Sequence, residues 1–447
     1  MRMMTRRHFA PAVLLLGTAA ALVAQEAQAP KPQAAKPQAP PEAAETPTFP
    51  AQVEQVIVDT VVTDKKGGVI RDLAREDFTI TEDGVPQAIA SFEAVVLPEH
   101  PSTTPPPPPK VTLNTTPEER RGRTFVILFD DMNITPFRAN QAKAAVASFL
   151  EKGTREGDRV TLVSSAGGVW WSARMESGRA KLLDMVKRFD GRLIPDMSNE
   201  RMSDWEALRI HVYRDPQVVE RVLRRYETYG VTQVMQQQQD STGRAGTVED
   251  PYVSGRASEV YYMALTRLRT TLDALERALN GLSAAKGRKS VILVSEGFIH
   301  DVNQDEFKRV NQASRRANAA IYFLNARGLE GMPVAMTAQF GQALPDQDVG
   351  FAFAETIDAV AGADLVASDS GGFTIRNTND LGKGIQRIAD ETQAYYLLGY
   401  VPQNAARDGK FRKIQVKLAN GKGLQVRARK GYYAPGEVGK SALQPKK

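Results

Sequence analysis

A cluster of oxygen-bearing side chains follows the apolar run at residues 125–129, which is typical of a buried strand. Asp131, Asn133 and Thr135 occupy alternate positions, so their side chains can point the same way from one loop. Carboxylate, amide and hydroxyl oxygens are hard donors that suit Mg²⁺ or Ca²⁺. The alternative interpretation is that Thr135 caps a helix whose first residue is Pro136, with the acidic residues complementing the helix N-terminus.

A second polar group, Ser295, Glu296 and Gly297, follows the apolar residues 291–294. The ligand crevice of an open α/β sheet lies outside the carboxyl ends of its strands, so both groups are expected at one rim. Glu296 would then add a carboxylate to the first cluster. The pattern predicts a divalent-cation site, with Mg²⁺ as the expected ion and Ca²⁺ or Mn²⁺ as alternatives.

The elements that would position these side chains alternate between strands and helices over residues 123–392. This alternation, with strands apolar throughout, favours an α/β fold with an open, mostly parallel sheet of the Rossmann-like type. Residues 190–257 interrupt the pattern and predict an insertion that contains a helix around residues 216–229. Buried strands are predicted at four apolar runs, residues 125–129, 160–163, 291–294 and 320–324.

Both flanks of this segment change to a period of two, which is typical of half-buried strands. Residues 50–97 and 393–435 each contain Asp-Gly or Asn-Gly turn signals between the alternating stretches. Three hairpin strands alone bury little surface, so we expect the two flanks to form one β-sandwich. The proline-rich residues 98–122 predict a linker between the first flank and the α/β segment.

The N-terminus has the order of a secretory signal over residues 1–29: arginines, an apolar run, then small residues. Arg6 and Arg7 are similar to the twin-arginine export motif. We therefore expect an exported protein, periplasmic or secreted, with no membrane span after signal removal. Residues 30–49 predict an Ala/Pro-rich linker and residues 436–447 a tail.

The composition excludes several classes of protein. The 447 residues contain no cysteine, which rules out disulfides, Cys-ligated zinc and Fe–S clusters. The net charge of +6 is small for this length, so no nucleic-acid partner is expected. Neither a glycine-rich phosphate loop nor a Gly-x-Ser-x-Gly elbow follows a strand in the sequence. These features favour a protein that is not an enzyme.

The two polar clusters resemble the von Willebrand factor type A domain, in which one strand ends in Asp-x-Ser-x-Ser and a later one in Thr-Asp-Gly. Asp131, Asn133 and Thr135 match the first element with Asn and Thr in place of the serines, and Ser295 and Glu296 match the second with Ser and Glu. The resemblance covers most of residues 50–435. Further short sequence segments resemble those of the exported VWFA-related proteins described from Acidobacteria. They lie at residues 77–78, 82–84, 287–290, 395–400 and 429–433.

This resemblance implies a metal-ion-dependent adhesion site, in which an acidic group of a protein partner completes the octahedron of a bound Mg²⁺. It also implies a threonine ligand before the second strand, for which Thr270 or Thr271 is the counterpart, and we assign Thr270. Glu296 is one methylene longer than the family's Asp, which leaves three alternatives open: weak binding, a preference for Ca²⁺, or an empty site.

Trp170 and Trp171 offer a different contact surface. Successive side chains of a strand point to opposite faces, so one tryptophan is expected in the core and the other in solvent. The exposed ring would anchor a partner, and local packing is the alternative.

The leading hypothesis is thus an exported, non-catalytic adhesion protein that binds a partner through Asp131, Asn133, Thr135, Glu296 and Thr270. A metal-independent interaction scaffold that uses the insertion at residues 190–257 is the alternative. A cell-envelope hydrolase is a third hypothesis, with less in the sequence to favour it.

Overall fold

The computed structural model describes most of the chain between residues 55 and 436. The predicted signal at residues 1–29 and the linker at residues 30–49 lie outside the described residues, as do nearly all of the linker at 98–122 and of the tail at 436–447. The described ranges are residues 55–97, 122–167, 170–231, 250–285, 287–329 and 348–436.

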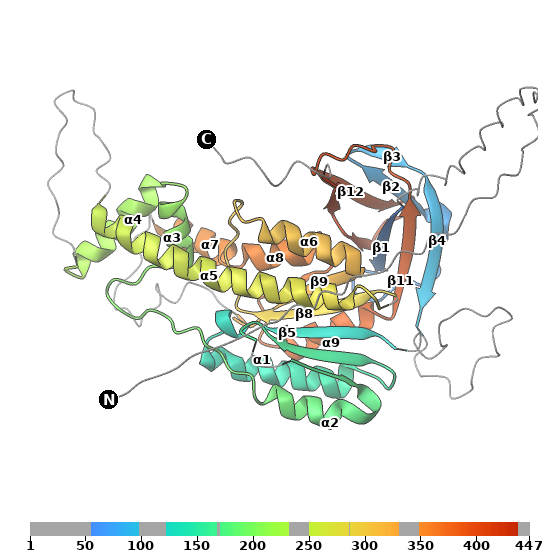
Figure 1. Cartoon of the computed structure of the whole chain (residues 1–447), viewed down its shortest axis with the longest axis horizontal. Helices are drawn as coiled ribbons and strands as arrows, with labels where there is room; N and C mark the ends of the chain where they lie inside the picture. Colours follow the sequence, from blue (N-terminus) through green and yellow to red (C-terminus); the bar gives the residue numbers. More distant parts are fainter. Residues whose placement is uncertain are drawn as a thin grey trace, which may run out of the picture. The chain divides into compact units, whose positions relative to one another are not determined.

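A six-stranded sheet with the order β10-β9-β8-β5-β6-β7 occupies the middle of the α/β segment (Figure 1). Every neighbouring pair is parallel except β6 and β7, so the predicted mixed α/β fold with a mostly parallel sheet is confirmed. The strands are β5 (Thr124–Phe129), β6 (Arg159–Ser164), β7 (Trp170–Arg174), β8 (Lys289–Ser295), β9 (Ala319–Asn325) and β10 (Thr374–Ile375).

Helices cover both faces of this sheet, which explains why its central strands are apolar throughout. One face packs on α5 (Pro251–Leu282), α6 (Glu306–Ala317) and α8 (Ala361–Asp369). The other face packs on α1 (Pro136–Ser148), α2 (Met175–Val186) and α9 (Leu381–Glu391), with a π-helical turn, η4 (Phe149–Gly153), after α1. Among the described helices, none combines the length and apolar character needed to cross a bilayer.

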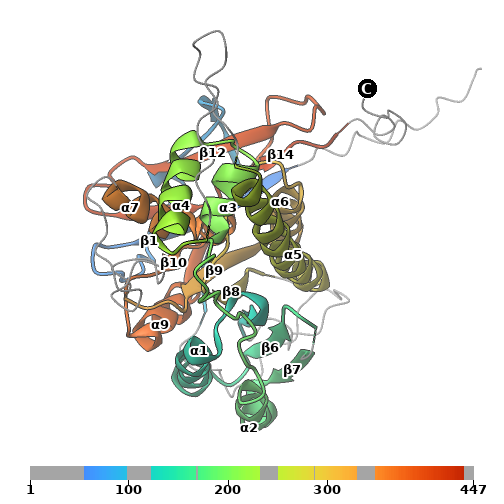
Figure 2. The same cartoon turned by 90° about the vertical axis from the view of Figure 1, so that its left-hand side faces the viewer.

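Three further helices lie at one end of the sheet. α3 (Asp204–His211) and α4 (Pro216–Thr228) pack beside the first half of α5, and α7 (Val349–Asp358) lies close to them (Figure 2). Asp215 caps α4 by accepting hydrogen bonds from the amides of Gln217 and Val218 at 3.1 and 3.4 Å. The described helices of the insertion therefore form a wall next to the central sheet.

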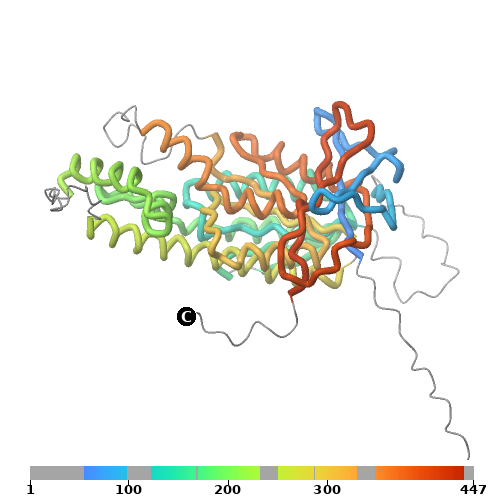
Figure 3. The backbone as a smooth tube through the Cα atoms, turned by 90° about the horizontal axis from the view of Figure 1, so that it is seen from above, coloured from blue at the N-terminus to red at the C-terminus, as the bar shows by residue number. Residues whose placement is uncertain are grey.

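Two four-stranded antiparallel sheets combine strands from both flanks of the chain, which lie side by side in Figure 3. Their inner faces share one hydrophobic core that includes Val58, Phe78, Tyr396 and Ile414. One sheet has the order β13-β1-β11-β4 and the other β14-β12-β2-β3. The strands are β1 (Val56–Thr63), β2 (Phe78–Glu82), β3 (Val85–Gln87), β4 (Ile89–Val96), β11 (Ala394–Tyr400), β12 (Phe411–Leu418), β13 (Gln425–Ala428) and β14 (Gly431–Tyr433), with a 3₁₀ turn, η1 (Arg75–Asp77), before β2.

Candidate functional site

The two polar clusters meet where β5 and β8 end. β5 and β8 are parallel neighbours, so their carboxyl ends lie at the same rim of the sheet. Ser295 Oγ donates a 2.7 Å hydrogen bond to Asp130, and the Glu296 amide donates to the Asn133 carbonyl at 3.1 Å. The loop after β5, which contains the 3₁₀ turn η3 (Asp131–Asn133), is thereby fixed to the loop after β8.

Asp130, which the sequence analysis did not select, is the buried centre of this junction. Its carboxylate is fully buried and accepts hydrogen bonds from Thr271 Oγ1 at 2.6 Å, Ser295 Oγ at 2.7 Å and Asn133 Nδ2 at 3.0 Å. Burial raises the pKa of Asp130, while these three donors act in the opposite direction. Hydrogen bonds from the uncharged hydroxyls of Ser295 on β8 and Thr271 on α5 thus connect both elements to the Asp130 carboxylate at the end of β5.

Asp131 points away from this centre toward the end of β6. Its carboxylate accepts hydrogen bonds from the hydroxyls of Ser164 and Ser165 at 3.0 and 2.8 Å and from the amide of Ala166 at 3.0 Å. Nε of Arg192 lies 3.1 Å from its Oδ2 atom. The two neighbouring aspartates therefore connect different elements: Asp130 connects β5 to β8 and α5, and Asp131 connects the loop after β5 to the end of β6.

Glu296 caps the N-terminus of α1. Its Oε1 atom accepts 2.7 Å hydrogen bonds from both the amide and the hydroxyl of Thr135, and Nε of Arg138 lies 3.5 Å from Oε2. α1 begins at Pro136, as the alternative interpretation of this motif expected, but the Thr135 hydroxyl makes no hydrogen bond to a helix amide. A carboxylate is favourable there because the helix N-terminus carries partial positive charge.

Thr271, rather than the predicted Thr270, reaches the junction. Thr270 is partly exposed, and its hydroxyl donates to the Thr266 carbonyl of its own helix at 2.9 Å. Thr271 is fully buried because it lies three residues after Leu268, on the apolar stripe of α5. Helical periodicity over residues 268–275 would have distinguished the two threonines.

A strap formed by residues 191–193 covers the loop after β5. The amide of Arg192 donates to the Asp131 carbonyl at 2.8 Å, and the amide of Leu193 donates to the Ile134 carbonyl at 3.0 Å. Only glycine fits at position 191, where a Cβ atom would lie 2.4 Å from the Ile134 oxygen. The strap brings the Arg192 side chain over Asp131.

The predicted cation ligands have other hydrogen-bond or ionic partners in this structure. Asp131 and Glu296 each lie close to an arginine, and their oxygens accept hydrogen bonds from different parts of the molecule. Asn133 Oδ1 accepts from Nε of Arg267 at 3.3 Å, and Thr270 faces away. Among the residues described, no group of three or more His, Cys, Asp or Glu side chains is placed to hold a metal ion.

Thr271→Val is expected to lower the free energy of unfolding by about 1–3 kcal/mol, because it removes a donor from a buried carboxylate while keeping the side-chain shape. Thr270→Val, one residue away, is expected to change it by less than about 0.5 kcal/mol. Urea denaturation of the two variants checks this. Equal effects would show that the hydrogen bond to Asp130 contributes nothing specific.

A cleft of about 800 Å³ opens beside the junction, at the carboxyl ends of the strands. It is lined by the start of α1, the segment between α2 and α3, the first half of α5, the loop after β8 and the end of α7. Four of its lining residues are large apolar side chains that are strongly exposed: Phe137 (88%), Ile194 (85%), Met197 (54%) and Met263 (45%). Large exposed apolar side chains gathered around one cleft are typical of an interaction surface.

The charges along the cleft are mostly paired. Arg267 lies 2.6 Å from Asp204, and Arg256 lies 2.7 Å from Asp196. Five arginines and four acidic residues line it: Arg138, Arg201, Arg256, Arg267 and Arg327, with Asp196, Asp204, Glu296 and Glu355. Its electrostatic character is therefore close to balanced, with a small excess of cationic groups.

Trp170 and Trp171 lie on β7, at the edge of the sheet, and do not line the cleft. The expectation that one ring enters the core is wrong, because 56% of Trp170 and 40% of Trp171 are exposed. The two side chains point to opposite faces, but helices cover neither face of an outermost strand completely. Lys181 Nζ lies 5.5 Å from the centre of the Trp171 ring.

Comparison with known protein families finds no match to this chain, and comparison with curated proteins finds none either.

Proposed function

We propose that this chain is an exported, non-catalytic binding protein with a von Willebrand type A-like domain. In this proposal a protein partner docks in the cleft at the carboxyl ends of β5 and β8. The observation that carries it is the cleft of about 800 Å³ flanked by exposed apolar side chains, among them Phe137 and Met263. Such a site at the strand ends is where α/β folds bind their ligands.

The proposed recognition needs no divalent cation. Arg192 and Arg138 supply the positive charge that the metal would bring to Asp131 and Glu296. The insertion takes part as well, because residues 193–205 and Arg256 form one wall of the cleft. The cleft thus contains both the strand-end residues of the adhesion hypothesis and the inserted residues of the scaffold hypothesis.

The hydrolase hypothesis gains no support from the serine and histidine that lie together. His211 Nδ1 is 2.9 Å from Ser258 Oγ, but the Ser258 hydroxyl donates its proton to the Ser254 carbonyl at 2.9 Å. With this hydroxyl orientation His211 Nδ1 is the donor to Ser258 Oγ, so the contact does not require a basic nitrogen facing the serine. Burial, and then the charge of Arg214, lowers the pKa of His211.

The test is site-specific photo-crosslinking with purified full-length protein added to an envelope extract. A benzophenone side chain in place of Phe137, on the cleft rim, is expected to capture a defined set of proteins with equal yield in EDTA and in Mg²⁺. Met263→Asp in the same cleft is expected to reduce the yield by about tenfold or more, because it puts a charge into an apolar contact.

The same benzophenone in place of Arg188, an exposed residue after α2, provides the control. Capture of the same proteins at both positions would mean that contact with the cleft is not specific. Capture that EDTA abolishes and Mg²⁺ restores would contradict metal-independent recognition and favour the adhesion site with a bound cation.

A further inference from the structure

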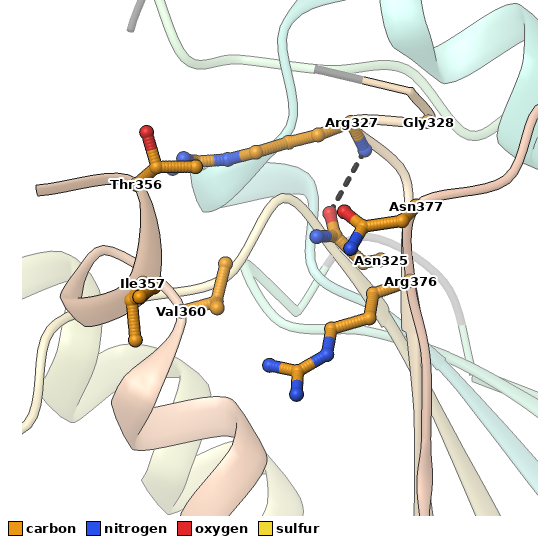
Figure 4. Close-up of a pocket in the computed structure, with 8 residues that line it drawn as sticks. All are labelled: Asn325, Arg327, Gly328, Thr356, Ile357, Val360, Arg376 and Asn377. Carbon is orange, nitrogen blue, oxygen red and sulfur yellow. Dashed lines mark hydrogen bonds between the residues drawn. The ribbon is translucent and has the colours of Figure 1, made fainter. Parts of the chain in front are cut away.

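A smaller pocket of about 280 Å³ lies beyond the cleft, where β9 and β10 end (Figure 4). Asn325 is the last residue of β9, and Arg376 and Asn377 follow β10. Arg327 and Thr356 line both this pocket and the large cleft, so the two lie next to each other. At about 30 Å³ per water molecule, the pocket has room for about nine waters, so an acidic side chain fits in it.

Hydrogen-bond donors face the pocket without an acidic residue among its described lining. Asn325 is 7% exposed, and its Oδ1 atom accepts from the Arg327 amide at 2.9 Å. The Nδ2 group of Asn325 therefore remains a donor, and Figure 4 shows it pointing into the pocket. The hydroxyl of Thr356 already donates to the Ala352 carbonyl at 2.9 Å, so it is left to accept.

Two guanidinium groups add positive charge. The Arg327 side chain crosses one side of the pocket toward Thr356, and Arg376 reaches the other side (Figure 4). Nη1 of Arg376 lies 2.9 Å from Asp364, and about half of the Arg376 side chain is exposed (51%). A partly exposed guanidinium with one acidic neighbour keeps donors for a second carboxylate.

The opposite wall of the pocket is apolar. Val360 is buried and Ile357 is 61% exposed, and both face the asparagines across the pocket (Figure 4). Gly328 has φ +72°, and a Cβ atom there would lie 2.6 Å from Asn379 Oδ1. This backbone conformation therefore favours glycine at position 328.

We infer that this pocket is the receptor for a carboxylate on the protein partner that occupies the cleft. An acidic side chain of the partner would bind the donors of Asn325 and Arg376 and pack its methylene groups on Val360 and Ile357. This inference rests on the proposed function, because the partner must lie in the cleft to reach the pocket. The type A resemblance implies that an acidic group of the partner binds a metal ion. In this inference the acidic group binds the guanidinium of Arg376 and the amide of Asn325 instead.

The test begins with a random peptide library displayed on phage and selected on the full-length protein in EDTA. Peptides whose binding is lost in Met263→Asp occupy the cleft, and they are expected to share an acidic residue. In such a peptide, replacing the acidic residue by its amide is expected to weaken binding to the wild type about tenfold. The same replacement is expected to have little effect on binding to Arg376→Gln.

Arg188→Gln serves as the matched control and is expected to bind like the wild type. Cleft-binding peptides whose acidic residue is absent, or insensitive to Arg376→Gln, would overturn this inference and leave the proposed function intact. Failure to obtain any peptide sensitive to Met263→Asp would overturn both. Binding of N-acetylglutamate or inorganic phosphate as tightly as the peptide would overturn the assignment to a protein partner.

Discussion

Replacing Asp59 by Ala is expected to lower the free energy of unfolding by about 3–5 kcal/mol. Asp59 lies on β1 of an antiparallel sheet and is 1% exposed. Nε of Arg288, the residue before β8, lies 2.8 Å from Asp59 Oδ2, and Nη2 of Arg429 lies 3.7 Å from Oδ1. Both guanidinium groups are almost fully buried, so removing the carboxylate leaves two uncompensated charges away from water.

This ion pair joins the antiparallel sheets to the α/β segment, so its loss is expected to weaken both together. Urea denaturation followed by far-UV circular dichroism measures the change. Asp72→Asn, at an exposed position of the same part of the chain, is expected to change the free energy by less than about 0.5 kcal/mol. Equal stability of Asp59→Ala and Asp72→Asn would contradict a structural role for the buried pair.

The sequence predicted the coarse fold because that prediction depends on local patterns. The apolar run at residues 125–129 became β5, and the run at residues 291–294 became β8, each buried on both faces. Their parallel pairing follows from the helices between them, which return the chain to the same end of the sheet. A strand predicted from an apolar run does not depend on which distant residues contact it.

The direction of each side chain at the strand ends could not be predicted in the same way. Asp130 and Asp131 are adjacent and chemically identical, but one contacts α5 and the other the end of β6. The choice depends on Thr271 and Ser164, which are far away in the sequence. The arginines that pair with the site carboxylates, such as Arg192, come from a strap that no local pattern revealed. The strand-end motif identifies the residues of the candidate site, but the side chains that contact them determine which bonds these residues can make.

The free energy of unfolding is expected to fall by about 2–3 kcal/mol between about pH 5 and about pH 8 through the titration of Glu355. Glu355, on α7, is buried, and burial together with the charge of Glu206 raises the pKa of Glu355 to about 7, against the attraction of Arg221. Below the ordinary pKa of a glutamate, Glu355 is protonated in both the folded and the unfolded protein. As the pH rises, the unfolded protein loses this proton first, and the folded protein keeps it to a higher pH. The stabilisation is therefore lost as the pH rises through about 7.

Glu355→Gln is expected to remove this dependence, because the amide keeps the shape and stays neutral. Arg221 Nη2, 3.0 Å from Glu355 Oε2, then retains Glu206 as its acidic neighbour at 3.7 Å. Glu227→Gln, on the exposed face of α4, is expected to preserve the wild-type pH profile. Denaturation curves at several pH values give the difference directly. A wild-type profile that runs parallel to that of Glu355→Gln from about pH 5 to about pH 8 would mean that Arg221 outweighs burial and keeps the Glu355 carboxylate ionised throughout this range.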